Sequence, residues 1–160
     1  MKRIRFAALA VAAIVPLAPL PARAQAVDVQ SSQQLMQEAA PLREQAKQGN
    51  GMASKILEKY PGHYTMLGYR GKDGQAELHE GVADFFVVLE GHATLLSGGK
   101  VLNPKPSGPG EVRGDAVQGG ASRKLAKGDV VHIPANVPHQ LLIPAGESFT
   151  YFIIKVDTPK

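Results

Sequence analysis

Residues 77–91 read Glu-Leu-His-Glu-Gly-Val-Ala-Asp-Phe-Phe-Val-Val-Leu-Glu-Gly. The run Phe85–Leu89 is aromatic and β-branched, which is typical of a strand, and a glycine on either side of it favours a turn. Glu77 and His79 stand two residues apart before the first turn, so on a strand their side chains point to the same face. The stretch therefore predicts two strands that meet at Gly81, with polar side chains gathered on one face of the first.

The same pattern continues along most of the chain. From residue 64 onward, short alternating or β-branched segments are separated by turns rich in Gly, Pro and Asn. Besides 85–89, we expect strands at 64–69, 75–81, 93–96, 130–133, 140–143 and 149–156. Because no long helices lie between these segments, the predicted fold class is mainly β, an antiparallel sandwich or closed barrel rather than a parallel α/β sheet.

Two segments depart from this pattern. Residues 25–62 are expected to be an N-terminal helical segment, in which Ser31 and Ser32 can cap a helix over 33–48 and a short second helix covers 52–59. Pro41 lies inside the first helix, so a kink, two short helices or one straight helix remain open. Within the predicted barrel domain, 63–160, the Pro- and Gly-rich residues 100–126 are expected to form a lid or a flexible insertion.

Residues 1–24 have the pattern of a secretory signal peptide. Three of the first five residues are basic, residues 6–20 are mostly apolar, and Ala22 and Ala24 supply small residues at positions −3 and −1 of a cleavage site. The apolar run is shorter than the roughly 20 residues that cross a bilayer, so we expect no membrane anchor after cleavage. The mature protein is predicted to be periplasmic or secreted.

The distribution of charge excludes one class of partner. The chain has 18 Lys and Arg against 14 Asp and Glu, but four of the basic residues and none of the acidic ones lie in 1–24. Residues 25–160 therefore carry no net charge, whereas nucleic-acid binding needs clustered positive charge on the folded domain. We expect no nucleic-acid partner. The lack of cysteine also excludes disulfides, thiol catalysis and Cys-ligated zinc.

Four polar residues in or beside the expected strands are candidates for a metal site. Glu77 and His79 share a strand face, Asp84 begins the next strand, and His139 follows a turn much later in the chain. Two imidazoles and one or two carboxylates suit a divalent ion of Fe, Mn, Zn, Ni or Co. From the spacing alone, hydrogen-bonded structural histidines and a solvated Glu77 remain the alternative interpretation.

The two stretches that hold these residues resemble the motifs of the cupin family. Glu77-Leu-His79, four residues, Asp84, six residues and Gly91 is similar to the first cupin motif, His-x-His, three or four residues, Glu, six residues, Gly. Residues 128–139, Gly-Asp-Val-Val-His-Ile-Pro-Ala-Asn-Val-Pro-His, are similar to the second, Gly, five residues, Pro-x-Gly, two residues, His. The resemblance covers about half of the mature chain and implies a small jelly-roll barrel.

The resemblance also implies a metal site made of His79, Asp84, His139 and Glu77. The chain departs from the family pattern in four places, with Glu77 for the first His, Asp84 for the Glu, Ile143 for an Asn, and Asn136 for a Gly, a position where Asn also tolerates left-handed backbone. Asp84 reaches one methylene less far than Glu and could orient His79 instead of binding the metal. A metal-free polar pocket is the alternative.

Two classes of function follow from the resemblance. One is an exported enzyme that binds a divalent metal in the barrel and acts on a small molecule by isomerase, lyase or dioxygenase chemistry. In that enzyme Glu77 is a candidate general base, with a pKa raised by burial, and Tyr64, Tyr69 and Arg113 are candidate substrate-binding residues. The other class is a non-catalytic periplasmic cupin that binds a small molecule or metal. The family commonly pairs its barrels, so the resemblance also implies a homodimer.

Overall fold

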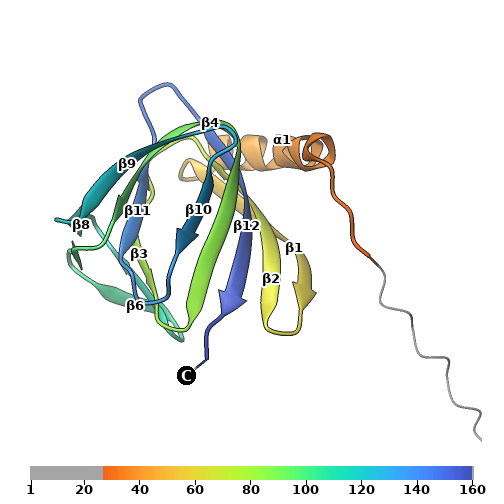
Figure 1. The fold of residues 1–160 in the computed structure, drawn as a ribbon. Helices are drawn as coiled ribbons and strands as arrows, with labels where there is room; N and C mark the ends of the chain where they lie inside the picture. Colours follow the sequence, from red (N-terminus) through yellow and green to blue (C-terminus); the bar gives the residue numbers. More distant parts are fainter. Residues whose placement is uncertain (1–26, 160) are drawn as a thin grey trace, which may run out of the picture.

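The computed structural model describes residues 27–159, and the predicted signal peptide at residues 1–24 lies outside them. One helix, α1 (Ser32–Gln48), precedes twelve strands in the described part of the chain (Figure 1). The strands are β1 (Met52–Tyr60), β2 (His63–Arg70), β3 (Ala76–His79), β4 (Val82–Ser97), β5 (Lys100–Val101), β6 (Lys105–Gly108), β7 (Glu111–Gly114), β8 (Val117–Gln118), β9 (Ala121–Ala126), β10 (Val130–Ile133), β11 (His139–Leu142) and β12 (Phe149–Asp157).

The strands form two antiparallel layers that share one long strand. One layer runs β1-β2-β12-β4-β10, and the other runs β9-β4-β11-β3-β7-β6. The first half of β4 pairs with β12 and β10, whereas its second half pairs with β9 and β11. The predicted mainly β, jelly-roll architecture is confirmed.

The main core lies between the two layers. It is built from inward-facing side chains of both, including Phe86 and Val88 of β4, Leu141 of β11, and Phe149 and Tyr151 of β12. This is the burial expected of strands in which every second residue points inward. The apolar interior continues along β12 to Ile153 and ends at the next inward residue, which is Lys155.

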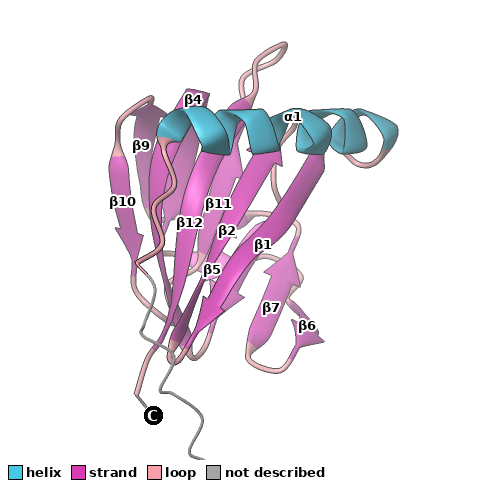
Figure 2. Ribbon diagram, turned by 90° about the vertical axis from the view of Figure 1, so that its right-hand side faces the viewer, coloured by secondary structure: helices cyan, strands magenta, loops and turns pink. Residues whose placement is uncertain are grey.

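The helix covers the outside of the barrel rather than its interior. Its N-terminus is closed by a capping box, in which Ser31 accepts a hydrogen bond from the Gln34 N–H and the Gln34 side chain accepts one from the Ser31 N–H. Its buried face, including Leu35, Ala39 and Leu42, packs on the outer face of the β1-β2-β12 layer (Figure 2). Pro41 is exposed and the helix continues through it, so one helix forms rather than two.

Two predictions on elements were wrong. Residues 52–59 form β1 instead of a second helix, because they pair along their length with β2 in a hairpin whose turn contains Gly62 at φ +78°. Residues 100–126 are not a loop: β6, β7 and β9 join the barrel, whereas β5 and β8 pair with each other as a small separate sheet. In both segments, pairing with other strands decides the conformation, because the local sequence preference of a short segment for helix or strand is weak.

The strands expected at 85–89 and 93–96 are one continuous strand, β4. A β-bulge replaces the turn expected at 90–91, because Leu89 is left without a partner in the register with β12. Such a bulge bends its strand, which is how β4 passes from one layer to the other. Gly91 takes φ +84° at this bend, and a Cβ there would lie 1.8 Å from the Ser148 carbonyl oxygen.

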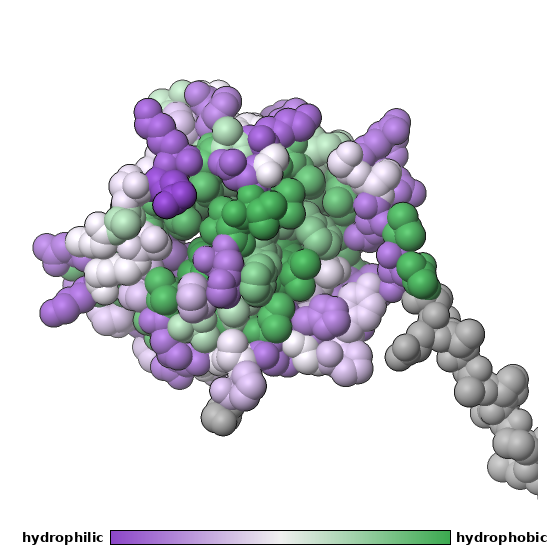
Figure 3. Space-filling view, in the orientation of Figure 1, coloured by the Kyte–Doolittle hydropathy of each residue, from purple (hydrophilic) through white to green (hydrophobic). Residues whose placement is uncertain are grey.

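The surface seen in Figure 3 has apolar atoms near its centre and hydrophilic side chains around them. Among the described residues, no helix has both the length and the apolar character that crossing a bilayer requires.

Candidate metal centre

The short strand β3 places the first group of polar side chains. It lies between β11 and β7, and its register sets Glu77 opposite His139 on one side and opposite Arg113 on the other. The same register sets His79 opposite Glu111 of β7. Residues directly opposite on antiparallel strands have neighbouring side chains, so β3 gathers five polar groups on one inner face.

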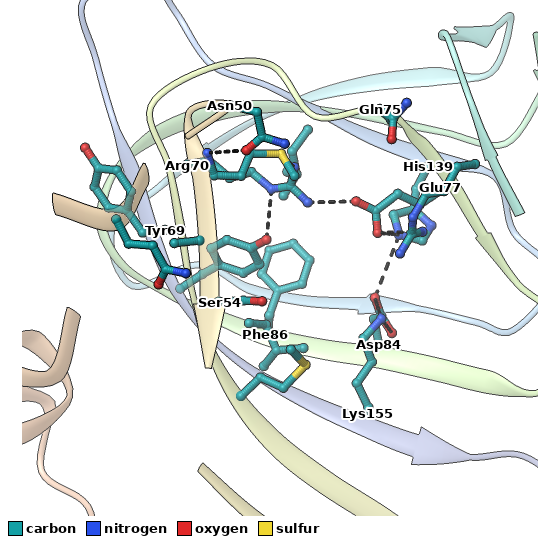
Figure 4. A pocket seen from close by; sticks show the side chains of 18 residues that line it. Asn50, Ser54, Tyr69, Arg70, Gln75, Glu77, Asp84, Phe86, His139 and Lys155 are labelled. Atoms are coloured by element: carbon teal, nitrogen blue, oxygen red, sulfur yellow. Dashed lines mark hydrogen bonds and ion pairs between the residues drawn. The ribbon is translucent and has the colours of Figure 1, made fainter. Parts of the chain in front are cut away.

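The facing layer supplies the second group. Asp84 of β4 is the register partner of Lys155 of β12, and Arg70 ends β2. The Arg70 guanidinium donates a hydrogen bond to Glu77 at 2.7 Å and another to the Tyr151 hydroxyl at 2.9 Å. The two layers are thus joined across the barrel by charged side chains, as Figure 4 shows.

The turn before β11 brings the second histidine to the first. Asn136 takes φ +64°, as the tolerance of Asn for left-handed backbone allows, and its N–H donates a hydrogen bond to the His79 carbonyl at 2.8 Å. The rings of His79 and His139 then lie with centroids 5.2 Å apart. The backbone of the second motif is therefore fixed directly to the end of the first.

Hydrogen bonds on Nδ1 orient both imidazoles. His139 Nδ1 lies 3.0 Å from the Val137 carbonyl, and His79 Nδ1 lies 2.7 and 2.8 Å from the two Glu111 oxygens. These acceptors assign the ring proton to Nδ1 in each residue, which leaves Nε2 with a free lone pair. A carboxylate or a backbone carbonyl behind the ring is the usual arrangement for a metal-binding histidine.

The two Nε2 atoms face the same two carboxylates. His79 Nε2 lies 3.4 Å from Asp84 Oδ2 and 3.7 Å from Glu77 Oε2, and His139 Nε2 lies 3.7 and 4.0 Å from the same atoms. Ligand atoms of Glu77, His79 and His139 all lie within 4.8 Å of one another. Two imidazoles and carboxylate oxygens at this spacing fit a divalent transition-metal ion.

The local charges keep the candidate ligands in their metal-binding forms. Burial alone would raise the pKa of Glu77, but Arg70 and Arg113 outweigh it and hold this pKa below its usual value. The expectation that burial raises the pKa of Glu77 was therefore wrong. An ionised Glu77 is a good ligand and a weak base, because its two guanidinium partners stabilise the carboxylate.

The pKa values of Asp84 and His139 also shift. Burial would raise the pKa of Asp84, but the neighbouring side chains of His79 and Lys155 lower it overall. Burial lowers the pKa of His139, which favours the neutral ring that a metal requires.

A cavity of about 450 Å³ leads to these residues. Its wall includes Glu77, Asp84 and His139, which lie on one side of it, and Asn50 and Ser54, which lie away from them (Figure 4). Gln45 and the apolar side chains of Phe86, Leu141 and Ile153 also line the cavity. The cavity is large enough for a small molecule and has one strongly polar end.

Of the three candidate substrate-binding residues, two line the cavity and one does not. Tyr69 and Arg113 line the cavity, and Arg113, on β7, lies 3.1 Å from Glu77. Tyr64 lies on β2 in register with Lys155 and is not among the residues that line the cavity.

Three charged residues of the site were not found from the sequence. They are Arg70, Glu111 and Lys155. The sequence held a signal for Lys155, because Phe149, Tyr151 and Ile153 alternate on one face and the next position on that face is Lys155. Arg70 is accommodated by Gly74, where a Cβ would lie 2.3 Å from Arg70 Nη1.

Comparison with known proteins identifies the class of fold. No family model and no curated protein sequence matches the chain. Among solved structures, the Schizosaccharomyces pombe Cnp3 cupin domain matches 66% of this chain and 64% of that chain, with a TM-score of 0.51 and 9% identity. A cupin-2 domain structure from Rhodospirillum rubrum matches 69% of this chain and 63% of that one, with a TM-score of 0.50 and 17% identity.

The fold is therefore that of a cupin, as the two sequence motifs implied. The match spans less than two thirds of the length of either structure. Enzymes are among the other similar structures, including the polyketide cyclase RemF from Streptomyces resistomycificus, at a TM-score of 0.47, 14% identity and coverage of 66% of this chain and 65% of that chain. These likenesses concern the fold, and function must be argued from the site.

Proposed function

We propose that this protein is a metal-dependent cupin enzyme that acts on a small anionic molecule in the cavity between the two layers. One observation carries the proposal: both histidines are held through Nδ1, so that their Nε2 atoms face the carboxylates of Glu77 and Asp84. Hydrogen-bonded histidines that present Nε2 to a common point with carboxylates are the usual donors of a divalent metal site.

A divalent ion held there would act as a Lewis acid on an oxygen atom of the substrate, which supports isomerase, lyase or dioxygenase chemistry. The protein's own residues prepare the site. Arg70 and Arg113 keep Glu77 ionised, and Glu111 fixes the ring of His79. Phe86, Leu141 and Ile153 give the same cavity apolar walls.

The charges of the cavity favour an anionic substrate. Arg70, Arg113 and Lys155 balance the three carboxylates of Glu77, Asp84 and Glu111. A divalent ion therefore gives the cavity a net positive charge. Because charge buried in a partly apolar cavity is costly unless it is compensated, a ligand with a carboxylate or a similar anionic group compensates it best.

Elemental analysis tests the metal site. The mature protein, from residue 25, is purified without chelator and without a metal-affinity tag, and its metal is quantified by mass spectrometry beside a His79→Ala/His139→Ala variant. We expect near-stoichiometric Fe, Mn, Zn, Ni or Co in the wild type and loss of it in the variant.

The control is a His92→Ala/His132→Ala variant, which removes two imidazoles from exposed positions of β4 and β10 and should keep the metal. Equal metal content in all three proteins, or none in any after anaerobic reconstitution, would contradict the proposal.

One observation favours a second function, non-catalytic binding of a small molecule. Every carboxylate of the site already lies within 3.3 Å of a cationic side chain, so the charged groups are paired without a metal. Small-molecule binding that survives removal of the metal, with no turnover in isomerase, lyase and O₂-uptake assays, would support this function over the enzyme.

The cellular setting is part of the proposal. We propose that the protein is exported, on the sequence pattern of residues 1–24, and that it acts as a homodimer, on the resemblance to cupins. Cell fractionation and light scattering of the mature protein test these two statements.

A further inference from the structure

Lys155 contacts two of the four candidate metal ligands, Asp84 and His79. Its Nζ lies 2.6 and 2.7 Å from the two carboxylate oxygens of Asp84 and 2.9 Å from His79 Nε2. The side chain is 13% exposed. The Lys155 amine thus shares one imidazole and one carboxylate with the proposed metal.

The position of Lys155 follows from the fold and not from a freely chosen side-chain conformation. The inward face of β12 runs through Phe149, Tyr151 and Ile153, all buried, and Lys155 is the next residue on that face. The antiparallel register with β4 sets Lys155 directly opposite Asp84. A lysine at this position must extend its amine into the barrel, because strand geometry sends alternate side chains to the same side.

Two cations cannot use the same donor atoms at once. The Lys155 Nζ–H donates a hydrogen bond to the lone pair of His79 Nε2. A metal ion bound by His79 needs that same lone pair. A divalent ion would also meet the positive charge of Lys155 at close range inside the barrel, where charges are screened less than in water. Metal entry therefore requires the ammonium to leave His79 and Asp84.

We propose that Lys155 is a tethered cation that competes with the metal for His79 and Asp84 and so weakens the affinity of the site for divalent ions. This inference rests on the proposed metal site. When a metal binds, the displaced Lys155 amine moves toward the cavity, where an anionic substrate can pair with it. The anion and the metal then favour each other's binding. The metal frees the Lys155 amine to pair with the anion, and the anion compensates the positive charge that the metal adds.

The test is the affinity of the metal-free protein for Co²⁺, followed by its visible absorption and by calorimetry. Lys155→Met and Lys155→Gln remove the charge with similar side-chain length, and Lys124→Met makes the same change at an exposed position of β9. We expect the dissociation constant to fall at least tenfold in both Lys155 variants and to be unchanged in Lys124→Met. Circular dichroism confirms that each variant is folded.

The outcomes separate this inference from the proposed function. Wild-type binding that is unchanged or weakened in folded Lys155→Met and Lys155→Gln overturns the competition and leaves the metal site standing. No binding by the wild type or by either variant overturns the metal site and the competition together. Binding by the Lys155 variants alone confirms the competition and shows that the wild-type site holds an ammonium in place of a metal.

Discussion

Glu77 is the residue on which the charge balance of the site depends most. It accepts a hydrogen bond from Arg70, lies 3.1 Å from Arg113 Nη1, and faces the Nε2 atoms of both histidines. Its side chain is 15% exposed and that of Arg70 is 9% exposed. Removing one partner of a largely buried ion pair leaves the other charge uncompensated, which costs more than the pair itself gains.

We expect Glu77→Gln to lower the free energy of unfolding of the metal-free protein by about 3 kcal/mol, because Arg70 then stays buried without its carboxylate. Urea denaturation at pH 7 measures it. The matched control is Glu58→Gln on the exposed side of β1, which should change stability by less than about 0.5 kcal/mol. A similar loss in the two variants would contradict the role given to Glu77.

For single residues, the sequence predicts contacts between residues that are close in the chain. It misses contacts that depend on how the strands align. Glu77 and His79 share a face because they are two residues apart on a strand, and that spacing is visible in the sequence. Asp84 and His139 were candidates because of their places beside the expected strands, and the resemblance to the cupin motifs implied that they belong to one site. Arg70 and Lys155 were missed, because their place beside Glu77 and Asp84 depends on how β2, β12 and β4 align, and no single segment specifies that alignment.

The bulge in β4 is the element that holds the two layers in one barrel. It lies where β4 changes partners, from β12 and β10 to β9 and β11. Gly91 is required there for two separate reasons, its φ of +84° and the approach of the Ser148 carbonyl oxygen. A side chain at this residue would force β4 away from the loop before β12.

Gly91→Ala is therefore expected to destabilise the protein by about 2 kcal/mol or more, in the upper part of the usual range for single substitutions. Gly62→Ala isolates the backbone effect, because Gly62 has φ +78° but no atom lies within 4 Å of the position that its Cβ would take, and it should cost about 1 kcal/mol. Thermal and urea unfolding of both variants measure the difference. Equal losses would show that the approach of Ser148 is unimportant.

The elements that the sequence predicted well are those with strong alternation. The strand at 130–133 has the predicted bounds, and the strand at 149–156 extends by only one residue. Residues 52–59 were wrongly predicted as a helix. The segment is short and its apolar residues have no clear period, so its pairing with β2 decides its conformation. The Pro and Gly residues of 100–126 predicted a loop, but some of them lie within the short strands β6 and β7 and others in the turns between strands.

At the scale of the whole molecule, the ionisable groups between the layers make stability depend on pH. The pKa values of Glu77 and Asp84 are lowered from 4.5 and 3.8, and the pKa of His139 is lowered from 6.5. In each case the unfolded chain binds the proton more readily than the folded one, so stability rises with pH where these groups titrate.

We therefore expect the free energy of unfolding of the metal-free protein to be highest near pH 7. It should begin to fall below about pH 6.5 as His139 of the unfolded chain takes up a proton, and fall more steeply below about pH 4.5 as the carboxylates do. Urea denaturation at pH 7, 5.5 and 4 measures this. In Glu77→Gln the acidic part of the fall should be shallower, and a wild-type stability that is constant from pH 7 to pH 4 would contradict the prediction.

The charged and the uncharged polar residues of the cavity come from different elements. The charged groups come from strands of both layers, whose positions are fixed by register and by the core, whereas Gln45 and Asn50 come from the end of α1 and the turn after it. Substitutions at Gln45, Asn50 and Ser54 can therefore change which molecules enter while the charged end is left intact. This division makes the barrel a suitable starting point for laboratory evolution, because the range of accepted ligands can be varied without repeated loss of the folded scaffold.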